Sequence, residues 1–308
     1  MRKGILIGIP LAIILLYFAW SLSLLTENAS NERANIIDAI PEGTAENIRV
    51  SILPSEILQG DPVLVTINGT SSVKSLSLNG KELKAFNHRG KSSVTIGIDL
   101  RAKTGTSTIA VLLNDGRKVE EKFVVREREI VKVTFSIPKK LGGDSKESEK
   151  RLVSTLVKEG AIINSLPTSG SKLWRDEFIF PVADPFVTDV YGKSRRTGGT
   201  TLSHKGTDFR APTGTEIYAM NSGEVVFSRP LRNYGNTIVI DHGLGLQTIY
   251  MHLSRFDVKE GDVVEKRQTI GRSGDTGYTF GAHLHLSIRI NGISIDPMKF
   301  MSILGIGL

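Results

Sequence analysis

An alternating segment that begins at two histidines constrains the fold of this chain more than any other feature. Residues 284–290, Leu-His-Leu-Ser-Ile-Arg-Ile, alternate as a half-buried strand does. His283 and His285 are two positions apart, so a strand points both imidazoles to one face. Far upstream, His204 and Asp208 lie four residues apart around a glycine, a pattern that favours a turn leading into a strand. A fold that brings these groups together can bind zinc through nitrogen and oxygen ligands.

Composition narrows the chemistry further. The chain has no cysteine, so disulfides and thiolate ligands are excluded and a metal site must use histidine and carboxylate. The net charge of +7 is spread along the sequence, without a basic run interleaved with aromatic residues. We therefore expect no nucleic-acid binding. A length of 308 residues with 40% hydrophobic content predicts two domains with their own cores.

The N-terminus predicts a membrane anchor. Residues 5–25 carry no charge and, at about 1.5 Å per residue, make a helix of roughly 31 Å, long enough to cross a bilayer. Arg2 and Lys3 precede this run, so the positive-inside rule predicts a cytoplasmic N-terminus and a periplasmic or extracellular remainder. A cleaved signal peptide is the alternative, but the run is long for one and residues 25–28 offer no small-x-small cleavage site.

Residues 48–137 are predicted to form a small β module. Short alternating apolar runs are separated by turn signals such as Asn79-Gly80 and Asp115-Gly116, the second of which predicts a hairpin. This pattern resembles bacterial immunoglobulin-like β-sandwiches and indicates a spacer or a module that binds a protein partner. The predicted strands are 48–53, 63–67, 73–78, 94–100, 108–113 and 119–125.

Residues 138–177 are predicted to be a linker with a short helix. Apolar residues fall on one face over 148–158, and Gly160 fits a helix C-cap. The following stretch, 161–177, is polar and unpatterned. It fits a tether better than an extended segment that lies over a downstream site.

Residues 178–302 are predicted to form a second domain of antiparallel β-strands. Its expected strands are 224–228, 237–241, 246–253, 262–264 and 283–290, separated by glycine-containing turns. His252 ends the third of these, and Tyr250 is expected on the same face, in a structural or an assisting role. His242 is expected to be a turn residue outside the site.

Taken in order, these motifs resemble a known family. His-x-x-x-Asp at 204–208, Tyr-x-His-Leu at 250–253 and His-Leu-His at 283–285 follow the pattern of the lysostaphin-like (glycyl-glycine endopeptidase-type) zinc peptidases. Residues 233–243 and 271–277 are also similar to stretches of that family, so the resemblance covers about 125 residues. It implies a mainly β peptidase domain that hydrolyses amide bonds in peptidoglycan stem peptides or cross-bridges.

The resemblance also assigns roles to residues. It implies that His204, Asp208 and His285 bind one Zn²⁺ per chain and that His252 and His283 are catalytic. Such a zinc site keeps one position open for water and lowers the pKa of that water toward about 7, and a neutral histidine can then accept its proton. The alternatives are a structural zinc with His283 as fourth ligand, and a packed core histidine at 252.

The same resemblance bears on the substrate groove and on function. Residues 190–201 are similar to a loop at the groove edge of the family, with Tyr191 in place of the usual phenylalanine, and their glycines suggest mobility. Two other functions compete with hydrolysis of peptidoglycan. The first is a non-catalytic regulator that binds peptidoglycan or activates a separate hydrolase, and the second is a membrane-tethered protease of proteins. The five retained site residues argue against the regulator.

Overall fold

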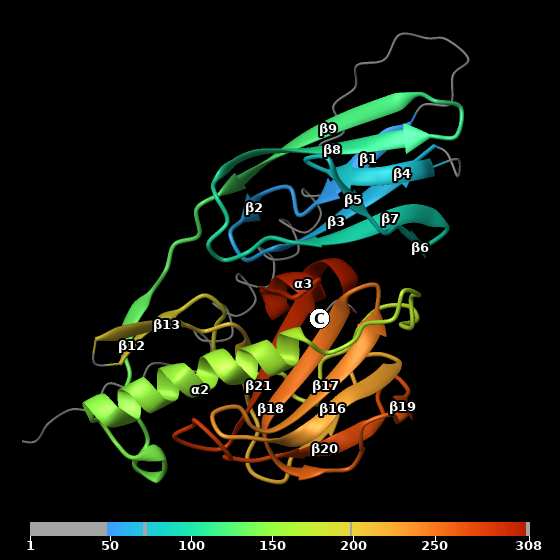
Figure 1. The fold of residues 1–308 in the computed structure, drawn as a ribbon. Coiled ribbons are helices and arrows are strands. Elements are labelled where there is room, and N and C mark those ends of the chain that lie inside the picture. The colour runs from blue at the N-terminus through green and yellow to red at the C-terminus, as the bar shows by residue number, and fades with distance from the viewer. Residues whose placement is uncertain (1–47, 70–72, 198, 306–308) are drawn as a thin grey trace, which may run out of the picture. The chain divides into compact units, whose positions relative to one another are not determined.

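The computed structural model describes residues 48–69, 73–197 and 199–305 (Figure 1). It is mainly β, as predicted. The expected membrane span at 5–25 lies outside these residues, and within them there is no helix both long and apolar enough to cross a bilayer.

Two sheets with a shared apolar core make up the N-terminal β module. The first sheet has the order β1-β3-β7-β6 and the second β2-β9-β8-β4-β5. Side chains from both sheets, among them Val65, Ile96, Ile109 and Val111, are buried in one cluster. The immunoglobulin-like assignment stays a prediction. The strands are β1 (Arg49–Leu53), β2 (Ile57–Leu58), β3 (Pro62–Asn68), β4 (Val73–Leu78), β5 (Lys81–Leu83), β6 (Phe86–His88), β7 (Lys91–Gly97), β8 (Gly105–Leu113) and β9 (Lys118–Arg126).

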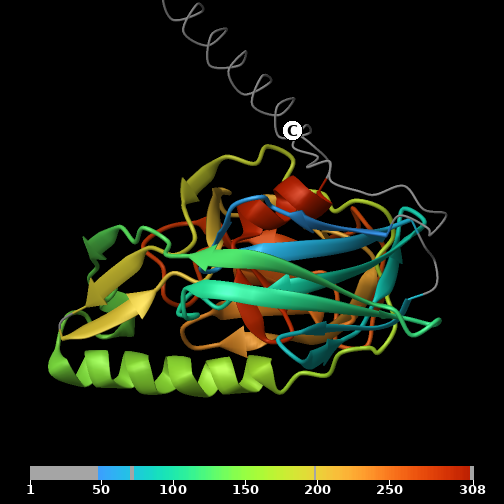
Figure 2. The same ribbon diagram turned by 90° about the horizontal axis from the view of Figure 1, so that it is seen from above.

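Between the β module and the C-terminal sheet, the chain forms a small sheet and a long helix. Strand β10 (Lys132–Thr134) pairs in parallel with β12 (Ser194–Thr197), which pairs with β13 (Thr200–Ser203) in an antiparallel hairpin. A 3-10 turn η1 (Lys139–Leu141) precedes helix α2 (Lys146–Asn164), which Ser145 caps by accepting a hydrogen bond from Ser148 N at 3.1 Å. The β12–β13 hairpin lies beside the first turns of α2 in both views (Figures 1 and 2).

A ten-stranded antiparallel sheet forms the C-terminal part. Its main order is β11-β14-β21-β18-β17-β16-β19, with β15, β20 and β22 paired at its sides. The elements are β11 (Val187–Asp189), β14 (Thr207–Arg210), β15 (Glu216–Tyr218), β16 (Gly223–Leu231), β17 (Gly235–Gly243), β18 (Leu246–Phe256), β19 (Val263–Val264), β20 (Thr269–Ser273), β21 (His283–Ile290), β22 (Ile293–Ile295) and helix α3 (Pro297–Leu304).

Two predictions for residues 138–177 are wrong: the helix is longer than expected, and the segment after it is packed against the sheet instead of forming a tether. Helix α2 runs past Gly160, because Ile163 is buried in a cluster with Phe227, Ile249 and Met251 of the sheet, and this packing outweighs the helix-breaking tendency of glycine. The segment after α2 is anchored as well. The carboxylate of Asp241 accepts hydrogen bonds from Thr168 Oγ1 and Ser169 N, both at 2.7 Å, and Trp174 is buried.

His242 is a core residue of β17 and not a turn residue. Its imidazole is fully buried, with Nδ1 2.8 Å from Ser222 O and Nε2 2.8 Å from Thr248 Oγ1. Burial lowers its pKa to about 4. The neutral ring is therefore part of the folded state at neutral pH.

This buried imidazole predicts a loss of stability in acid. The unfolded imidazole has a pKa of about 6.5, so between pH 6.5 and 4 the unfolded state binds a proton that the folded state rejects. The contribution of His242 to the free energy of unfolding is fully present above pH 6.5 and falls by about 3 kcal/mol as pH drops to 4. We expect the free energy of unfolding, from denaturant titrations at pH 7 and pH 5, to drop less in His242→Gln than in the parent. Equal drops would contradict this.

Candidate metal centre and active site

Three predicted ligands meet where β14 and β21 pair. His204 follows β13, and Asp208 and His285 are directly opposite each other in the antiparallel register. Asp208 Oδ1 lies 3.0 Å from His204 Nε2 and 2.7 Å from His285 Nδ1, and these two nitrogens are 3.0 Å apart. Within the described residues, these three form a group whose ligand atoms lie close enough together to hold a metal ion.

The hydrogen bonds around this group orient its donor atoms. His204 Nδ1 lies 2.8 Å from Val190 O, so it donates there and leaves the Nε2 lone pair facing the cluster. The second carboxylate oxygen of Asp208 accepts a bond of 3.2 Å from Arg195 Nη2. Two imidazole nitrogens and one carboxylate oxygen therefore converge, a donor set that suits zinc and leaves a fourth position open.

Gly206 allows the cluster to close. A Cβ at this position would clash with Nε2 of His285 and the carbonyl oxygen of Leu286, and would lie 2.7 Å from His285 Cε1. The glycine between His204 and Asp208 was the signal in the sequence, although its contact with His285 could not be read from it.

Gly206→Ala is expected to displace the His285 ring or the strand that carries it. Overpacking of this kind costs about 1–3 kcal/mol, and the ring that moves is a metal ligand. We expect a lower thermal midpoint together with weaker zinc binding, measured by chelator competition. Gly281→Ala is the matched control, because a Cβ there meets no atom within 4 Å. Zinc affinity equal to that of the parent would contradict the packing argument.

A β-bulge turns His252 toward the cluster. On β18, residues 250–253 oppose only residues 236–238 of β17, so one extra residue is accommodated at this point. His252 has a left-handed backbone with φ of 63°, and its ring centroid is 4.9 Å from that of His283. Tyr250 does not share its face, contrary to the prediction. The tyrosine is buried in the core, where its hydroxyl accepts a hydrogen bond of 3.0 Å from Met220 N.

His252 and His283 both present their Nε2 atoms to the site. His252 Nδ1 lies 2.8 Å from Thr276 O, and His283 Nδ1 lies 2.9 Å from Gly281 O. These carbonyls are acceptors only, so each ring donates through Nδ1 and keeps a lone pair on Nε2. His283 Nε2 is 3.7 Å from Asp208 Oδ1.

Burial and charge set the protonation of the group. Burial opposes ionisation of Asp208, yet hydrogen bonds with His204 and His285 hold the pKa of its carboxyl well below the usual range. Burial, followed by the charges of His283 and His285, lowers the pKa of His252 to about 3. Burial likewise lowers the pKa of His285 to about 4. Both rings are neutral at neutral pH, the form that binds metal or accepts a proton.

The sequence did not single out Asp189 and Arg195, which support the ligands. Asp189 on β11 pairs with Lys193 and, at 2.6 Å, with Arg195, and lies 3.8 Å from His204 Nδ1. Burial raises the pKa of Asp189, but hydrogen bonds from Lys193 and Arg195 reverse this and leave it below the ordinary value. Their only signal was their place near the predicted groove-edge loop.

Tyr191, expected to line that groove edge, lies elsewhere. It is buried, and its hydroxyl donates a hydrogen bond of 2.8 Å to Ser294 O. Its ring also lies 5.4 Å from the guanidinium of Arg128, which follows the last strand of the β module. Tyr191 therefore packs between the β module and the C-terminal sheet.

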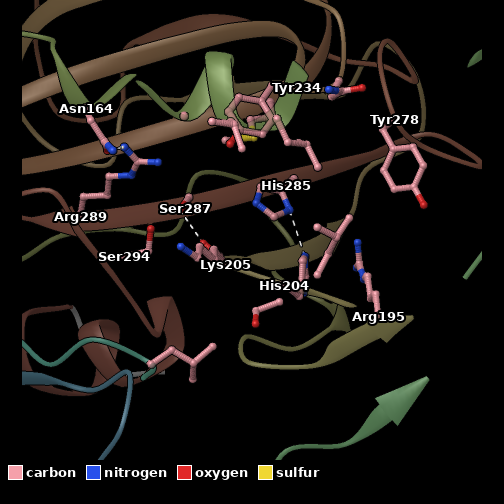
Figure 3. Close-up of a pocket in the computed structure, with 18 of the residues that line it drawn as sticks. Asn164, Arg195, His204, Lys205, Tyr234, Tyr278, His285, Ser287, Arg289 and Ser294 are labelled. Carbon is pink, nitrogen blue, oxygen red and sulfur yellow. Dashed lines mark hydrogen bonds between the residues drawn. The ribbon is translucent and has the colours of Figure 1, made fainter. Parts of the chain in front are cut away.

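A pocket of about 700 Å³ opens beside the cluster. Helix α2 forms one wall through Val153, Leu156 and Ala161, and residues of β13 form another. Figure 3 shows His204 and His285 near one end and Arg289 and Asn164 at the other.

Comparison with known proteins agrees with this fold. The model of peptidase family M23 matches residues 202–297. Over 96 residues the chain is 44% identical to the peptidoglycan DD-endopeptidase ShyA of Vibrio cholerae and 41% identical to the DD-carboxypeptidase/endopeptidase Mpg of Neisseria meningitidis. Each match covers 31% of this chain but only 22% of the relative. A Pseudomonas aeruginosa crystal structure assigned to peptidase M23 is 25% identical, with a TM-score of 0.59, and the match covers 80% of this chain and 95% of that one.

Residues 202–297 therefore form a domain of peptidase family M23 within this chain. The predicted resemblance to this class of zinc peptidases is confirmed.

Proposed function

We propose that this protein is a zinc-dependent endopeptidase that hydrolyses amide bonds in peptidoglycan stem peptides or cross-bridges. The observation that carries the proposal is the convergence of His204, Asp208 and His285, with His252 and His283 beside them, at one end of a pocket. Two relatives of the domain are named for endopeptidase activity, one of them on peptidoglycan.

The donor atoms present fit one zinc ion per chain. Nε2 of His204, Nδ1 of His285 and Oδ1 of Asp208 would hold it, while His204 Nδ1 donates to Val190 O and Asp208 Oδ2 accepts from Arg195. Bound there, zinc would supply Lewis acidity to a water molecule and to the carbonyl oxygen of the scissile amide.

The remaining two histidines are suited to proton transfer. The Nε2 atom of His252 carries a lone pair in the neutral ring, so it can accept a proton from the attacking water. The leaving amine needs a proton, which His283, whose side chain is 20% exposed, would donate from Nε2 in its protonated form, while His252 holds the proton taken from the water. The protonated form of either ring would also stabilise negative charge on the carbonyl oxygen.

We further propose that residues 5–25 anchor the protein in the membrane, with the N-terminus in the cytoplasm and the catalytic domain in the periplasmic or extracellular space. The uncharged run behind Arg2 and Lys3 supports this. An anchor would hold the domain near the wall and raise its effective concentration there. The β module would set its height or bind a protein partner.

A non-catalytic regulator is the other candidate function, but the structure favours the enzyme. A regulator needs no aligned set of donors, yet here three nitrogen and oxygen atoms lie within 4.8 Å of one another. Two further imidazoles lie beside them, each with its Nδ1 atom bonded to a backbone carbonyl.

Release of free amines from purified peptidoglycan tests the proposal. Full-length protein in detergent should release amines in the presence of zinc, and chelation should stop it. His283→Ala should bind zinc and release none, because it removes a proton-transfer group and no ligand. Zinc binding without amine release by the parent would reject the endopeptidase, and unchanged release by His283→Ala would reject the role of that ring.

A further inference from the structure

A buried arginine lies in the pocket that contains the candidate metal centre. Arg289 is on β21 four residues after His285, so the strand presents both side chains on one face. It lines the pocket, and Figure 3 shows its guanidinium pointing toward Asn164 at the C-terminal end of α2. Arg289 and His285 therefore belong to one cavity but to different ends of it.

The guanidinium of Arg289 has few partners for a buried cation. The residue is 7% exposed, and among the described residues no carboxylate is within ion-pair distance of it. Its hydrogen bond runs from Nη1 to Asn164 Oδ1 at 2.5 Å, and Nε has no hydrogen-bond partner in the part of the chain that the structure describes. Burial also lowers the pKa of the guanidinium. A cation kept out of water without a counter-ion costs free energy that an incoming anion would recover.

The surroundings of Arg289 favour an anion. Lys205 and Arg101 line the same pocket and are exposed there, and Asp99 is the one acidic side chain beside them. Asp99 is already 3.9 Å from Arg101. This end of the pocket therefore carries more positive than negative charge.

We propose that Arg289, assisted by Lys205, binds a carboxylate of the peptide substrate and so determines which peptides the enzyme accepts. A carboxylate matches the guanidinium through two parallel hydrogen bonds, and Nε is free to donate one of them. Asn164 is exposed, so its side chain can move away and leave Arg289 Nη1 to donate to the ligand instead. The inference rests on the proposed function, since it concerns the substrate of the same site.

The spacing along β21 predicts where this carboxylate lies. Four strand residues span about 13 Å between His285 and Arg289. An extended peptide has about the same rise per residue as a strand. The recognised carboxylate is therefore about four residues from the hydrolysed amide. A substrate of this class is a peptide with a free side-chain or terminal carboxylate at that separation.

The test compares the binding of two forms of one ligand. Soluble cross-linked stem peptides are used directly, or after conversion of their carboxylates to methylamides. Affinities for zinc-loaded, full-length His283→Ala protein are measured by calorimetry, so that hydrolysis does not interfere. We expect the free-carboxylate form to bind about tenfold tighter or more, as loss of a charge-assisted hydrogen bond predicts.

Variants assign this preference to Arg289. In Arg289→Gln the ratio of the two affinities should fall to about 1. Arg289→Lys should keep part of the preference for the carboxylate, because lysine keeps the positive charge but lacks the paired N–H donors of the guanidinium. Arg229→Gln is the matched control, because Arg229 is exposed and pairs with Glu260 away from the pocket. A ratio in Arg289→Gln equal to that of the parent, or a parent without a preference, would overturn the proposal.

Asn164→Asp gives an independent test at an exposed position. The new carboxylate would lie against Nη1 of Arg289 and compete with the ligand. The preference should fall severalfold while the thermal midpoint stays level or rises. An unchanged preference in this variant would count against the subsite.

The two proposals fail separately. Loss of preference in Arg289→Gln, in a protein that releases no amine from peptidoglycan, would support the carboxylate subsite and reject the endopeptidase. Zinc-dependent amine release with no carboxylate preference would support the endopeptidase and reject the carboxylate subsite.

Discussion

Asp208→Asn should remove most zinc binding and, with it, amine release from peptidoglycan. Asp208 Oδ1 lies 3.0 Å from His204 Nε2 and 2.7 Å from His285 Nδ1, and its other carboxylate oxygen accepts a hydrogen bond from Arg195 Nη2. An asparagine keeps the shape but loses the charge, and if its amide oxygen faces the metal, its N–H₂ group faces the Arg195 donor. We expect zinc affinity to fall by more than the roughly 10–100-fold that loss of a supporting partner costs.

The comparison with His283→Ala separates binding from chemistry. His283 is not in the ligand set, so His283→Ala should retain the metal content of the parent while it loses turnover. Metal analysis after dialysis against a weak chelator, run beside the amine assay, measures both quantities. If Asp208→Asn kept full zinc occupancy, the assignment of the ligands would be wrong. Asp241→Asn is a matched control, because Asp241 is a buried carboxylate on β17 away from the cluster.

Arg128→Ala should cause a large loss of stability although the residue lies outside the site. Arg128 Nη2 lies 2.5 Å from Asp61 Oδ1 and Nη1 lies 3.1 Å from Asp296 Oδ2, while Nε donates to Gln59 O at 2.6 Å. The Asp61 side chain is fully buried and that of Asp296 is 12% exposed. Removal of the shared cation leaves two carboxylates without their partner, which costs about 3–5 kcal/mol.

Denaturant titrations of full-length protein measure this loss, and Arg126→Ala is the matched control. Arg126 is two residues away and forms an ion pair of 3.1 Å with Glu56, but both side chains are mostly exposed. Such a pair contributes less than about 1 kcal/mol. If the two variants lost similar amounts, burial would not be what makes the Arg128 contacts important.

Local patterns in the sequence were enough to locate the site. The alternation through 283–290 fixed the face on which His283 and His285 lie, and β21 has these bounds in the structure. The turn around Gly206 placed Asp208 at the start of a strand, and antiparallel pairing then set it opposite His285. These features depend on the two-residue period of a strand, which is visible in the sequence as the alternation of apolar and polar residues.

Features that depend on tertiary contacts could not be predicted. The bulge at His252 breaks the two-residue period, so the rule that placed Tyr250 beside it fails at that residue. Gly160 looked like a helix end, but packing of Ile163 on the sheet carries α2 past it. Arg195 reaches Asp208 only because the β12–β13 hairpin folds back over the site.

Helix α2 precedes the family-matching stretch in the chain and yet forms a wall of its pocket. Part of the pocket wall is therefore encoded outside the stretch that carries the five candidate site residues. Substitutions in 146–164 can alter which peptide enters without touching a metal ligand or a proton-transfer group. Two proteins with the same five histidine and aspartate positions can thus diverge in substrate through the helix alone, and a comparison limited to 202–297 would miss the difference.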